Sequence, residues 1–335
     1  MKIGMLGLGL IGGRRLQIVQ KLQHEVVFAV DPDPVRRSQW ANHIPKLYSN
    51  RQDVDVPADV ILIALPHHLA YDAALWALHH GAHVLCEKPL GIYSDQSRHL
   101  CQLANQKKRC LGAGFNYRYL PGISRLQTLL QSNILGDILR VRMFIGHGGR
   151  PGMETEWKLQ KSLSGGGALM DPGIHLIDLV YYLFGESELL NCELRRVYWN
   201  SDVEDNALIS LKRDNIMISL EVSLTEWKNR FFIEVIGNNA MAILEGRGGN
   251  YGDQKLTLVK RWFWQSPTEQ PSIESWGLTD TSLDLETHAF LRVVAGEASD
   301  NILATGRDGI IAINLIEKLY SMHQKNMPSA IDKDF

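Results

Sequence analysis

Within its first twelve residues the chain reads Met-Lys-Ile-Gly-Met-Leu-Gly-Leu-Gly-Leu-Ile-Gly, a pattern that few folds can accommodate. A short apolar run leads directly into Gly7-x-Gly9-x-x-Gly12, and a helical pattern follows. The first glycine allows a tight turn, the second lets a pyrophosphate approach the backbone, and the third lets the helix pack on the strand. The amino end of such a helix offers free N–H groups to phosphates. The stretch therefore predicts a dinucleotide-binding strand–helix–strand unit.

A single acidic residue at the end of the second apolar run indicates which dinucleotide binds. Asp31 follows residues 24–30 and lies about 20 residues beyond Gly12, where an acid is expected to hold a ribose hydroxyl. A carboxylate there pairs with the 2′ and 3′ hydroxyls of NAD and repels the 2′-phosphate of NADP. Arg36 and Arg37 follow shortly and could soften this preference, so the sequence predicts NAD and leaves NADP open.

The first third of the chain alternates short apolar runs with helical patterns. Residues 60–65, Val-Ile-Leu-Ile-Ala-Leu, are typical of a central parallel strand that is buried on both faces. The alternation predicts an α/β fold with an N-terminal Rossmann domain, a doubly wound parallel sheet, over residues 1–118. The expected strands are 2–6, 25–30, 60–65, 83–86 and 110–115, and the expected helices are 11–22, 34–42, 69–80 and 94–106.

The rest of the chain, residues 119–335, changes character. Consecutive strand-like runs separated by turn signals such as Arg213-Asp214-Asn215 predict a C-terminal α+β domain with a large, mostly antiparallel open sheet. We expect this domain to bind substrate and to mediate oligomerisation, with its last helix packing back on the first domain. A glycine-rich polar segment, 146–167, is expected to be a loop over the site. The expected strands are 138–146, 193–200, 207–212, 215–224, 231–237, 241–245 and 255–264, and the expected helices are 168–184, 283–296 and 306–324.

Composition excludes several classes of function. The 335 residues include 35 basic and 37 acidic side chains, a balance that does not favour nucleic acid or an anionic membrane as partner. The N-terminus is already a strand, so we expect no signal peptide, and no apolar run reaches the ~18–20 residues of a membrane span. The four cysteines lack metal or disulfide spacing, and the histidines between 67 and 83 lack accompanying ligands. We therefore expect a cytoplasmic protein without a bound metal.

Two segments carry residues suited to catalysis. Lys88, in Glu87-Lys88-Pro89, lies at the carboxyl end of an expected strand, the edge at which ligands bind in such sheets. Its backbone is restricted by Pro89, and a cis bond is possible there. A lysine at that edge can hydrogen-bond a substrate oxygen, although a solvated lysine at a strand end fits the sequence equally well.

The second segment is Gly165-Gly-Gly-Ala-Leu-Met-Asp171-Pro-Gly-Ile-His175. Asp171 and His175 are four residues apart, so on a helix they share a face. A carboxylate beside an imidazole can orient it for general acid–base work. The alternatives are a buried core histidine and an aspartate that caps the helix ahead of Pro172.

Taken together, these motifs resemble the glucose–fructose oxidoreductase / inositol dehydrogenase / rhizopine-catabolism (Gfo/Idh/MocA) family over nearly the whole chain. The resemblance implies NAD(P)-dependent oxidation or reduction at a hydroxyl carbon of a sugar, sugar derivative or cyclitol. It implies that His175 removes the hydroxyl proton, that Lys88 stabilises the developing alkoxide, and that Asp171 anchors substrate or tunes His175. One departure is Ala70, where the family commonly has a histidine near the cofactor.

Further contacts are expected from the residues themselves and from the resemblance. Arg118, Arg150, Lys158 and Lys161 could together bind a phosphate or carboxylate of the substrate, although loop cations are often simply solvated. The predicted cofactor contacts are Gly7, Leu8, Gly9, Leu10, Ile11, Gly12, Asp31, Arg36, Leu65, Pro66, His68, Glu87 and Lys88. The predicted substrate contacts are Lys88, Asn116, Arg118, Arg150, Trp157, Lys158, Asp171 and His175.

Two other functions share such a fold. An NAD-dependent glycosidase oxidises its substrate transiently and produces no net NADH, and a dinucleotide-binding regulator performs no chemistry. The presence of both Lys88 and His175 favours a dehydrogenase. The aromatic run 260–264 suits a subunit interface, so we expect a homodimer or homotetramer formed through the open sheet.

Overall fold

A computed structural model describes residues 1–261 and 270–326 of the chain. The described chain forms two compact units. The first contains residues Met1–Tyr119, Ser162–Gly165 and Thr281–Ile313, and the second contains the remainder. The predicted domain boundary at residue 118 would place the segment Thr281–Ile313 in the second unit. In the structure it joins the first because Glu286 and Thr287 both bind the side chain of Arg15.

The first unit is built on a six-stranded parallel sheet in the order β3-β2-β1-β4-β5-β6. This confirms the predicted Rossmann architecture. The short β3 was not predicted, because two residues are too few to show a period. The strands are β1 (Lys2–Leu6), β2 (Glu25–Val30), β3 (Leu47–Tyr48), β4 (Val60–Ile63), β5 (His83–Glu87) and β6 (Leu111–Gly114).

Helices flank both faces of this sheet. The chain moves from β1 to β2 in one direction and from β4 through β6 in the other, so right-handed crossovers put α1 on one face and α3 and α4 on the opposite face. Helix α8 packs beside α1. The helices are α1 (Leu10–Lys21), α2 (Pro34–Gln39), α3 (His67–His79), α4 (Ser94–Lys107) and α8 (Ser282–Val294), with a 3₁₀ turn at Asn116–Tyr119.

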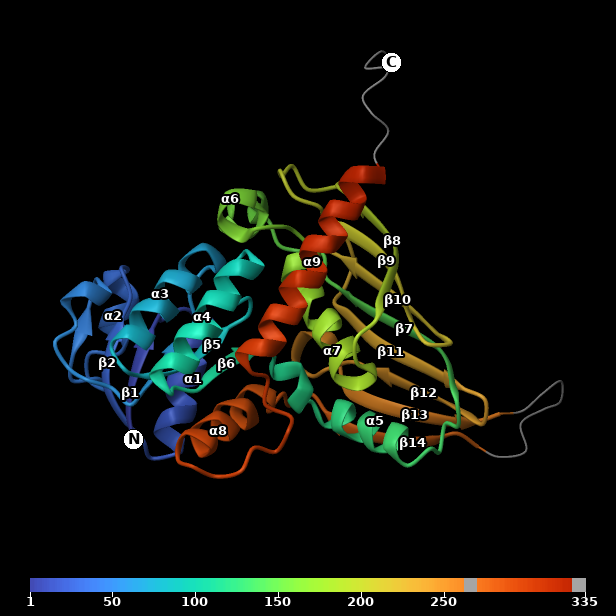
Figure 1. Ribbon diagram of the computed structural model, residues 1–335, viewed down its shortest axis with the longest axis horizontal. Coiled ribbons are helices and arrows are strands. Elements are labelled where there is room, and N and C mark those ends of the chain that lie inside the picture. The colour runs from blue at the N-terminus through green and yellow to red at the C-terminus, as the bar shows by residue number, and fades with distance from the viewer. Residues whose placement is uncertain (262–269, 327–335) are drawn as a thin grey trace, which may run out of the picture. The chain divides into compact units, whose positions relative to one another are not determined.

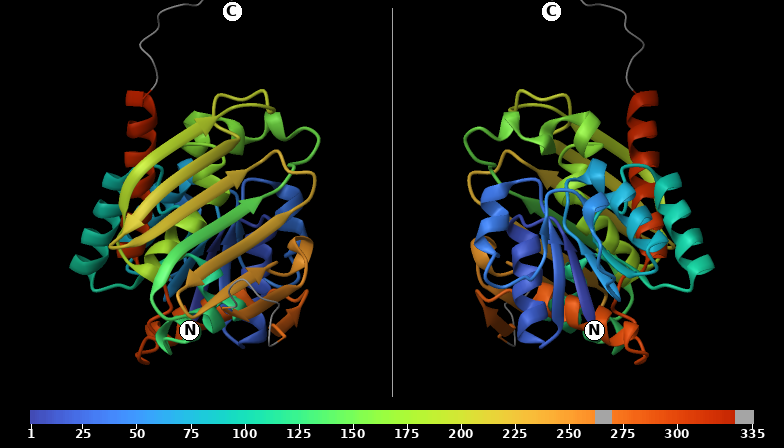
Figure 2. Two further views of the ribbon diagram at one scale, coloured as in Figure 1. Left: turned by 90° about the vertical axis from the view of Figure 1, so that its right-hand side faces the viewer. Right: turned by 90° about the vertical axis from the view of Figure 1, so that its left-hand side faces the viewer.

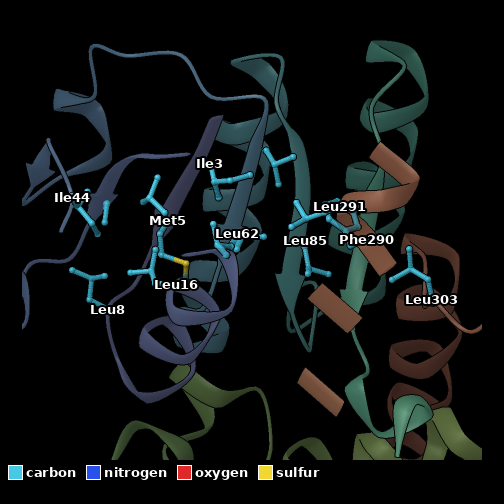
Figure 3. Close-up of a cluster of buried hydrophobic side chains, with 14 residues drawn as sticks. Ile3, Met5, Leu8, Leu16, Ile44, Leu62, Leu85, Phe290, Leu291 and Leu303 are labelled. Carbon is cyan, nitrogen blue, oxygen red and sulfur yellow. The ribbon is translucent and has the colours of Figure 1, made fainter. Parts of the chain in front are cut away.

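A cluster of buried apolar side chains holds α1 and α8 against the sheet. Alternate residues of β1 (Ile3 and Met5) and Leu62 of β4 contribute to the same cluster as Leu16 of α1 and Phe290 of α8 (Figure 3). All five are essentially inaccessible to solvent. Full burial of one such side chain stabilises the fold by about 1.5–3 kcal/mol. The cluster thereby anchors the strand that leads into the glycine loop.

The second unit contains an eight-stranded sheet in the order β14-β13-β12-β11-β7-β10-β9-β8. Within this sheet, as far as it is described, β7 and β10 alone pair in parallel and the other neighbours pair antiparallel, so the predicted large, mostly antiparallel sheet is confirmed. The strands are β7 (Ile138–Gly146), β8 (Glu188–Arg195), β9 (Asn206–Arg213), β10 (Ile216–Ser223), β11 (Arg230–Gly237), β12 (Ala240–Glu245), β13 (Gln254–Lys260) and β14 (Ser272–Gly277).

Three predicted elements of this unit differ from the structure. The strand expected at 193–200 ends at Arg195, because the N–H groups of residues 197–199 donate to the buried carboxylate of Asp205 instead. The strand expected at 255–264 ends at Lys260, and residues 262–264 lie outside the described residues. Strand β14 was not predicted. The helix expected at 168–184 begins only at Ile174.

Helices α5 (Pro121–Gln131) and α7 (Ile174–Phe184) lie on one face of the eight-stranded sheet (Figure 1). The described chain places no helix on the opposite face, which is turned to the viewer in the left panel of Figure 2. Helix α5 was not predicted. Helix α9 (Gly306–Asn326) contributes residues to both units.

The segment expected as a loop, 146–167, contains 3₁₀ turns at Met153–Thr155 and Trp157–Leu159 and the short α6 (Lys161–Ser164).

A search of the described helices for a membrane span finds none that is long and apolar enough to cross a bilayer.

Candidate functional site

The glycine loop between β1 and α1 has the geometry that its sequence predicts. Gly7 has φ of +94°, and a Cβ there would collide with the carbonyl oxygen of Ala64. A Cβ on Gly12 would collide with the carbonyl oxygen of Gly7, so the start of α1 packs directly on the turn. At Gly9, by contrast, a Cβ would find only Arg36 Nη1, 3.9 Å away. The loop is therefore closely packed at its two ends and open at Gly9, as a phosphate-binding loop requires.

The amino end of α1 follows this opening. Gly9 is its N-cap, and no side chain of the described residues caps it by a hydrogen bond. The first N–H groups of a helix have no partner within the helix and, with the helix dipole, attract an anion. Leu10, predicted as a cofactor contact, is 78% exposed beside this end. The loop and helix together fit the pyrophosphate of a dinucleotide.

Asp31 is buried at the end of β2 and fastens the glycine loop. Its Oδ2 accepts a hydrogen bond from the N–H of Leu8 at 2.7 Å, and its Oδ1 accepts one from the N–H of Asp33 at 2.9 Å. Arg36 Nη1 lies 3.6 Å from Oδ2. Each carboxylate oxygen can accept more than one hydrogen bond, so Asp31 retains capacity for a ribose hydroxyl.

The chain after β4 enters α3 two residues earlier than predicted. Leu65 and Pro66 precede this helix, which begins at His67 rather than at residue 69. His67 is buried, and its Nδ1 lies 2.9 Å from the carbonyl oxygen of Ser164. The Nδ1 of His68, a predicted cofactor contact, is buried and finds no hydrogen-bond partner among the described residues. Such a buried, unsatisfied atom fits a ligand at this edge of the sheet.

Lys88 follows β5 immediately, at the carboxyl end of the sheet, and the Lys88–Pro89 peptide is cis. The preceding Glu87 belongs to a buried ionic network. Its Oε1 and the Oε2 of Glu286 each lie 2.6 Å from Nη2 of Arg15, and Arg15 Nη1 donates to Thr287 Oγ1 at 2.7 Å. Burial acts to lower the pKa of Arg15, but the two carboxylates outweigh it and raise the pKa above its ordinary range. The network ties the residue before Lys88 to α1 and α8.

Two predicted substrate contacts, Asn116 and Arg118, make polar contacts within the first unit. Arg118 is buried, and its Nη2 lies 2.8 Å from Oδ1 of Asp308. Asn116 Nδ2 donates to Ser282 Oγ at 2.7 Å. Both side chains therefore hold the returning segment 281–313 to the Rossmann fold. Arg118 belongs to the first unit, and Arg150 and Lys158 of the second unit pair with Glu156 and Asp171.

In the second unit, Asp171 and His175 are not on one helical face, and that prediction is wrong. Asp171 is extended, with φ of −152° and ψ of 105°, and its peptide bond to Pro172 is cis. Helix α7 begins at Ile174 with Gly173 as its N-cap, so Asp171 does not cap it. Proline lacks the N–H that a continuous helix needs, which ends the regular pattern at this point. His175, the second residue of α7, is buried.

Asp171 instead forms an ion pair with a residue of the preceding loop. Lys158 Nζ lies 2.7 Å from Asp171 Oδ2, and this carboxylate raises the pKa of Lys158 against the effect of burial. The ammonium group also lies 5.9 Å from the ring centroid of Trp157. The structure thus joins three predicted substrate contacts, Trp157, Lys158 and Asp171. Arg150, a fourth, is exposed and pairs with Glu156 at 2.7 Å.

Three further residues of this region, His147, Arg247 and Tyr251, were not predicted. His147 follows β7, and burial lowers its pKa while the charge of Asp171 acts to raise it. Arg247 stacks on Tyr251, with 4.0 Å between the guanidinium carbon and the ring centroid, and lies 3.3 Å from Asp280 Oδ2. Burial raises the pKa of Tyr251. Neither motif nor spacing marks these residues, because their loops meet only in the folded unit.

Comparison with known proteins gives matches for both parts of the chain. Residues 1–115 match the family model described as "Oxidoreductase family, NAD-binding Rossmann fold". Residues 123–243 match the model described as "GFO/IDH/MocA C-terminal domain". The two matches follow each other in the order that the resemblance predicts.

Curated relatives include several sugar dehydrogenases. The levoglucosan dehydrogenase of Pseudarthrobacter phenanthrenivorans is 30% identical over 178 residues, which are 52% of this chain and 45% of that protein. The glucose-6-phosphate 3-dehydrogenase of Bacillus subtilis is 27% identical over 70% of this chain and 67% of its own length. The D-glucoside 3-dehydrogenase of Escherichia coli is 32% identical over 39% of this chain and 37% of its length. The match thus spans less than half of the first and third of these relatives.

Solved structures resemble the chain over almost its whole length. The WlbA dehydrogenase from Bordetella pertussis, in complex with NADH and UDP-GlcNAcA, superposes with a TM-score of 0.82 at 17% identity and covers 99% of both chains. A levoglucosan dehydrogenase in complex with NADH gives 0.83 at 20% identity and covers 97% of both. At these identities the likeness establishes the fold.

Proposed function

Because this chain belongs to the Gfo/Idh/MocA family of oxidoreductases with an NAD-binding Rossmann fold, we propose that it is a sugar dehydrogenase. It would transfer a hydride between nicotinamide and a ring hydroxyl or ketone carbon of a sugar, sugar derivative or cyclitol. The observation that carries this proposal is the glycine loop, which is packed at Gly7 and Gly12 and open at Gly9. Relatives named for levoglucosan, glucose 6-phosphate and D-glucosides support the substrate class.

We propose NAD as the preferred cofactor. The carboxylate of Asp31 would accept hydrogen bonds from the ribose hydroxyls and repel a 2′-phosphate. Arg36 is the residue that could reduce this preference, but it lies 3.6 Å from Asp31 and 3.4 Å from Asp33, so its charge is already partly balanced. Bound NAD would supply the hydride acceptor, and the protein would supply placement.

The side chains would divide the remaining work. His175 would take the proton of the reacting hydroxyl as its carbon is oxidised. Lys88 would hydrogen-bond the same oxygen and stabilise its developing negative charge. Asp171, held by Lys158, would anchor a neighbouring substrate hydroxyl.

The test is the appearance of NADH on mixing the purified protein with NAD or NADP and a panel of polyols, inositols, hexoses and sugar phosphates. We expect one substrate class to be oxidised, and we expect Lys88→Ala and His175→Ala to abolish that reaction. Lys107→Ala on α4 and His79→Ala on α3 are matched controls, because both side chains are exposed. Tight NAD binding without net NADH, but with release of an alcohol from a glycoside, would instead establish a glycosidase.

We also propose that the helix-free face of the eight-stranded sheet forms a homodimer or homotetramer interface. Leu208 and Met217 are 55% and 64% exposed on this sheet, and Ile273 of β14 is similarly exposed. Exposed large apolar side chains on a face that no described helix covers favour association. Light scattering that gives a monomer at micromolar concentration would refute this proposal.

A cytoplasmic location agrees with the described cysteines, all of which are free thiols.

A further inference from the structure

One buried carboxylate holds the main chain immediately before Asp171. Glu204 lies in the loop before β9 and is nine-tenths buried. Its Oε1 accepts hydrogen bonds from the N–H of Gly167 and the N–H of Leu169, each at 3.0 Å, and from Tyr320 Oη at 2.9 Å. Its main-chain oxygen accepts a fourth from the N–H of Ala168 at 2.8 Å. Three consecutive N–H groups are therefore bound by a single residue.

The glycines of this segment are required by that contact. A Cβ on Gly166 would collide with Tyr320 Oη, and a Cβ on Gly167 would collide with the carbonyl oxygen of Glu204. Glycine is the residue that allows such close approach of backbone to a neighbouring group. Gly166 and Gly167 thus allow a close contact with Tyr320 and Glu204, which is separate from the close packing of the loop at residues 7–12.

The bound segment continues directly into the catalytic residues. The carbonyl of Gly167 accepts from the N–H of Asp171 at 2.9 Å, and the carbonyl of Ala168 accepts from the N–H of Gly173 at 2.8 Å. Gly173 is the N-cap of α7, and His175 is its second residue. The positions of Asp171 and of the first turn of α7 are therefore set by residues that Glu204 holds.

We propose that Glu204 and Tyr320 are positioning residues, which orient Asp171 and His175 through the main chain at 167–169. The proposal rests on the proposed function for the roles of Asp171 and His175. Three hydrogen bonds converge on one buried carboxyl oxygen, so this contact restrains the segment better than a turn would alone. Small displacements of catalytic groups lower rates steeply.

The ionisation of the pair agrees with this arrangement. Burial raises the pKa of Glu204, while the N–H groups of the bound segment and the Tyr320 hydroxyl act to lower it. Burial and the neighbouring carboxylate together raise the pKa of Tyr320 well above its ordinary value, so its hydroxyl remains a donor. The Tyr320 hydroxyl and two N–H groups of the bound segment therefore all donate to the same buried carboxyl oxygen.

The primary test uses Tyr320→Phe and Glu204→Gln, with Tyr198→Phe and Glu245→Gln as matched controls at exposed positions. Well below the unfolding temperature, we expect Tyr320→Phe to lower kcat by about tenfold, with KM and the Kd for NAD changed less than about threefold. We expect Glu204→Gln to lower kcat further. The double variant should lose less than the product of the two single losses, because Tyr320 acts through Glu204.

A second readout does not depend on turnover. The NMR titration of the His175 imidazole should shift in Tyr320→Phe and stay unchanged in Tyr198→Phe, and the amides of residues 167–169 should exchange faster with deuterium. A lowered unfolding temperature with unchanged kcat and unchanged His175 titration would overturn the proposal in favour of a purely structural contact. If the parent protein oxidises no sugar, the proposed function fails, and the titration alone then supports or refutes the positioning role.

Discussion

Lys158 Nζ lies 2.7 Å from Asp171 Oδ2, so the turn at Trp157–Leu159 is joined to the extended residue that precedes α7. The two residues are separated along the chain by α6 and the glycine run. The spacing of Asp171 and His175 had suggested that these two residues are neighbours on a helix. In the structure the ion-pair partner of Asp171 is Lys158. Two of the predictions below concern this contact, and three concern Arg15, Gly9 and Asp31 of the first unit.

Replacing Lys158 by methionine should remove the ammonium group that contacts Asp171 and lower kcat/KM by about tenfold, because this contact would no longer hold the carboxylate in position for a substrate hydroxyl. Steady-state kinetics of the variant measure this loss, and Lys158→Arg should recover part of it. An unchanged kcat/KM in Lys158→Met would exclude the pair from the reaction.

The same pair predicts how stability depends on pH. Asp171 raises the pKa of Lys158 in the folded protein, so the stabilising effect is fully present below the unfolded value of 10.5 and is lost as pH rises through the folded value. Urea unfolding of the parent and Lys158→Met should therefore differ by a constant amount from pH 7 to about pH 10 and converge above it. A difference that disappears near pH 8 would contradict this assignment.

Removing the buried guanidinium of Arg15 should strongly destabilise the first unit. Arg15→Met removes the buried cation that contacts both Glu87 and Glu286, and breaking a buried pair in this way costs about 3–5 kcal/mol. Urea unfolding gives the free energy directly. Arg14→Met is the matched control, because Arg14 is its exposed neighbour on α1. Equal effects of the two substitutions would show that the buried network contributes nothing specific.

Substitution of Gly9 should separate cofactor binding from stability. The backbone at Gly9 has φ of −67°, which alanine adopts readily, and its Cβ would meet no protein atom closer than 3.9 Å. Gly9→Ala should therefore fold with an unchanged or slightly higher unfolding temperature, yet weaken NAD binding at least about tenfold by filling the phosphate approach. Gly13→Ala should leave NAD affinity unchanged. If Gly9→Ala binds NAD normally, the loop does not hold the pyrophosphate.

Asp31→Asn should change cofactor preference. The amide keeps the size of the side chain and can still accept the Leu8 N–H, but it no longer repels a 2′-phosphate. We expect the Kd for NAD to rise and the Kd for NADP to fall, as measured by nucleotide fluorescence, with Asp72→Asn on α3 as an exposed control. Equal weakening of NAD binding and NADP binding would show that Asp31 only holds the glycine loop in place and does not select the nucleotide.

Several elements of the fold were predictable because their signals are local. The run at residues 60–65 and the glycines at 7, 9 and 12 each reflect a requirement of the immediate backbone, and β4 and the loop are found where expected. The helix across 168–173 was mispredicted because apolar spacing alone does not register the break at Pro172. The buried role of Arg118 was missed because its partner, Asp308, is 190 residues further along the chain.

The sequence by itself determined the Rossmann unit and the open antiparallel sheet, since periodicity and short-range spacing encode these features. It marked Lys88, Asp171 and His175 as candidates through their motifs and the family resemblance. Only the tertiary structure decided that Arg15 is buried between two carboxylates, that Lys158 holds Asp171, and that Glu204 binds the glycine segment. The physical reason is that a single charged residue in a sequence is expected to face solvent, since nothing in its local pattern shows a partner. Its burial becomes stable only when distant segments bring the compensating hydrogen bonds and charges to it.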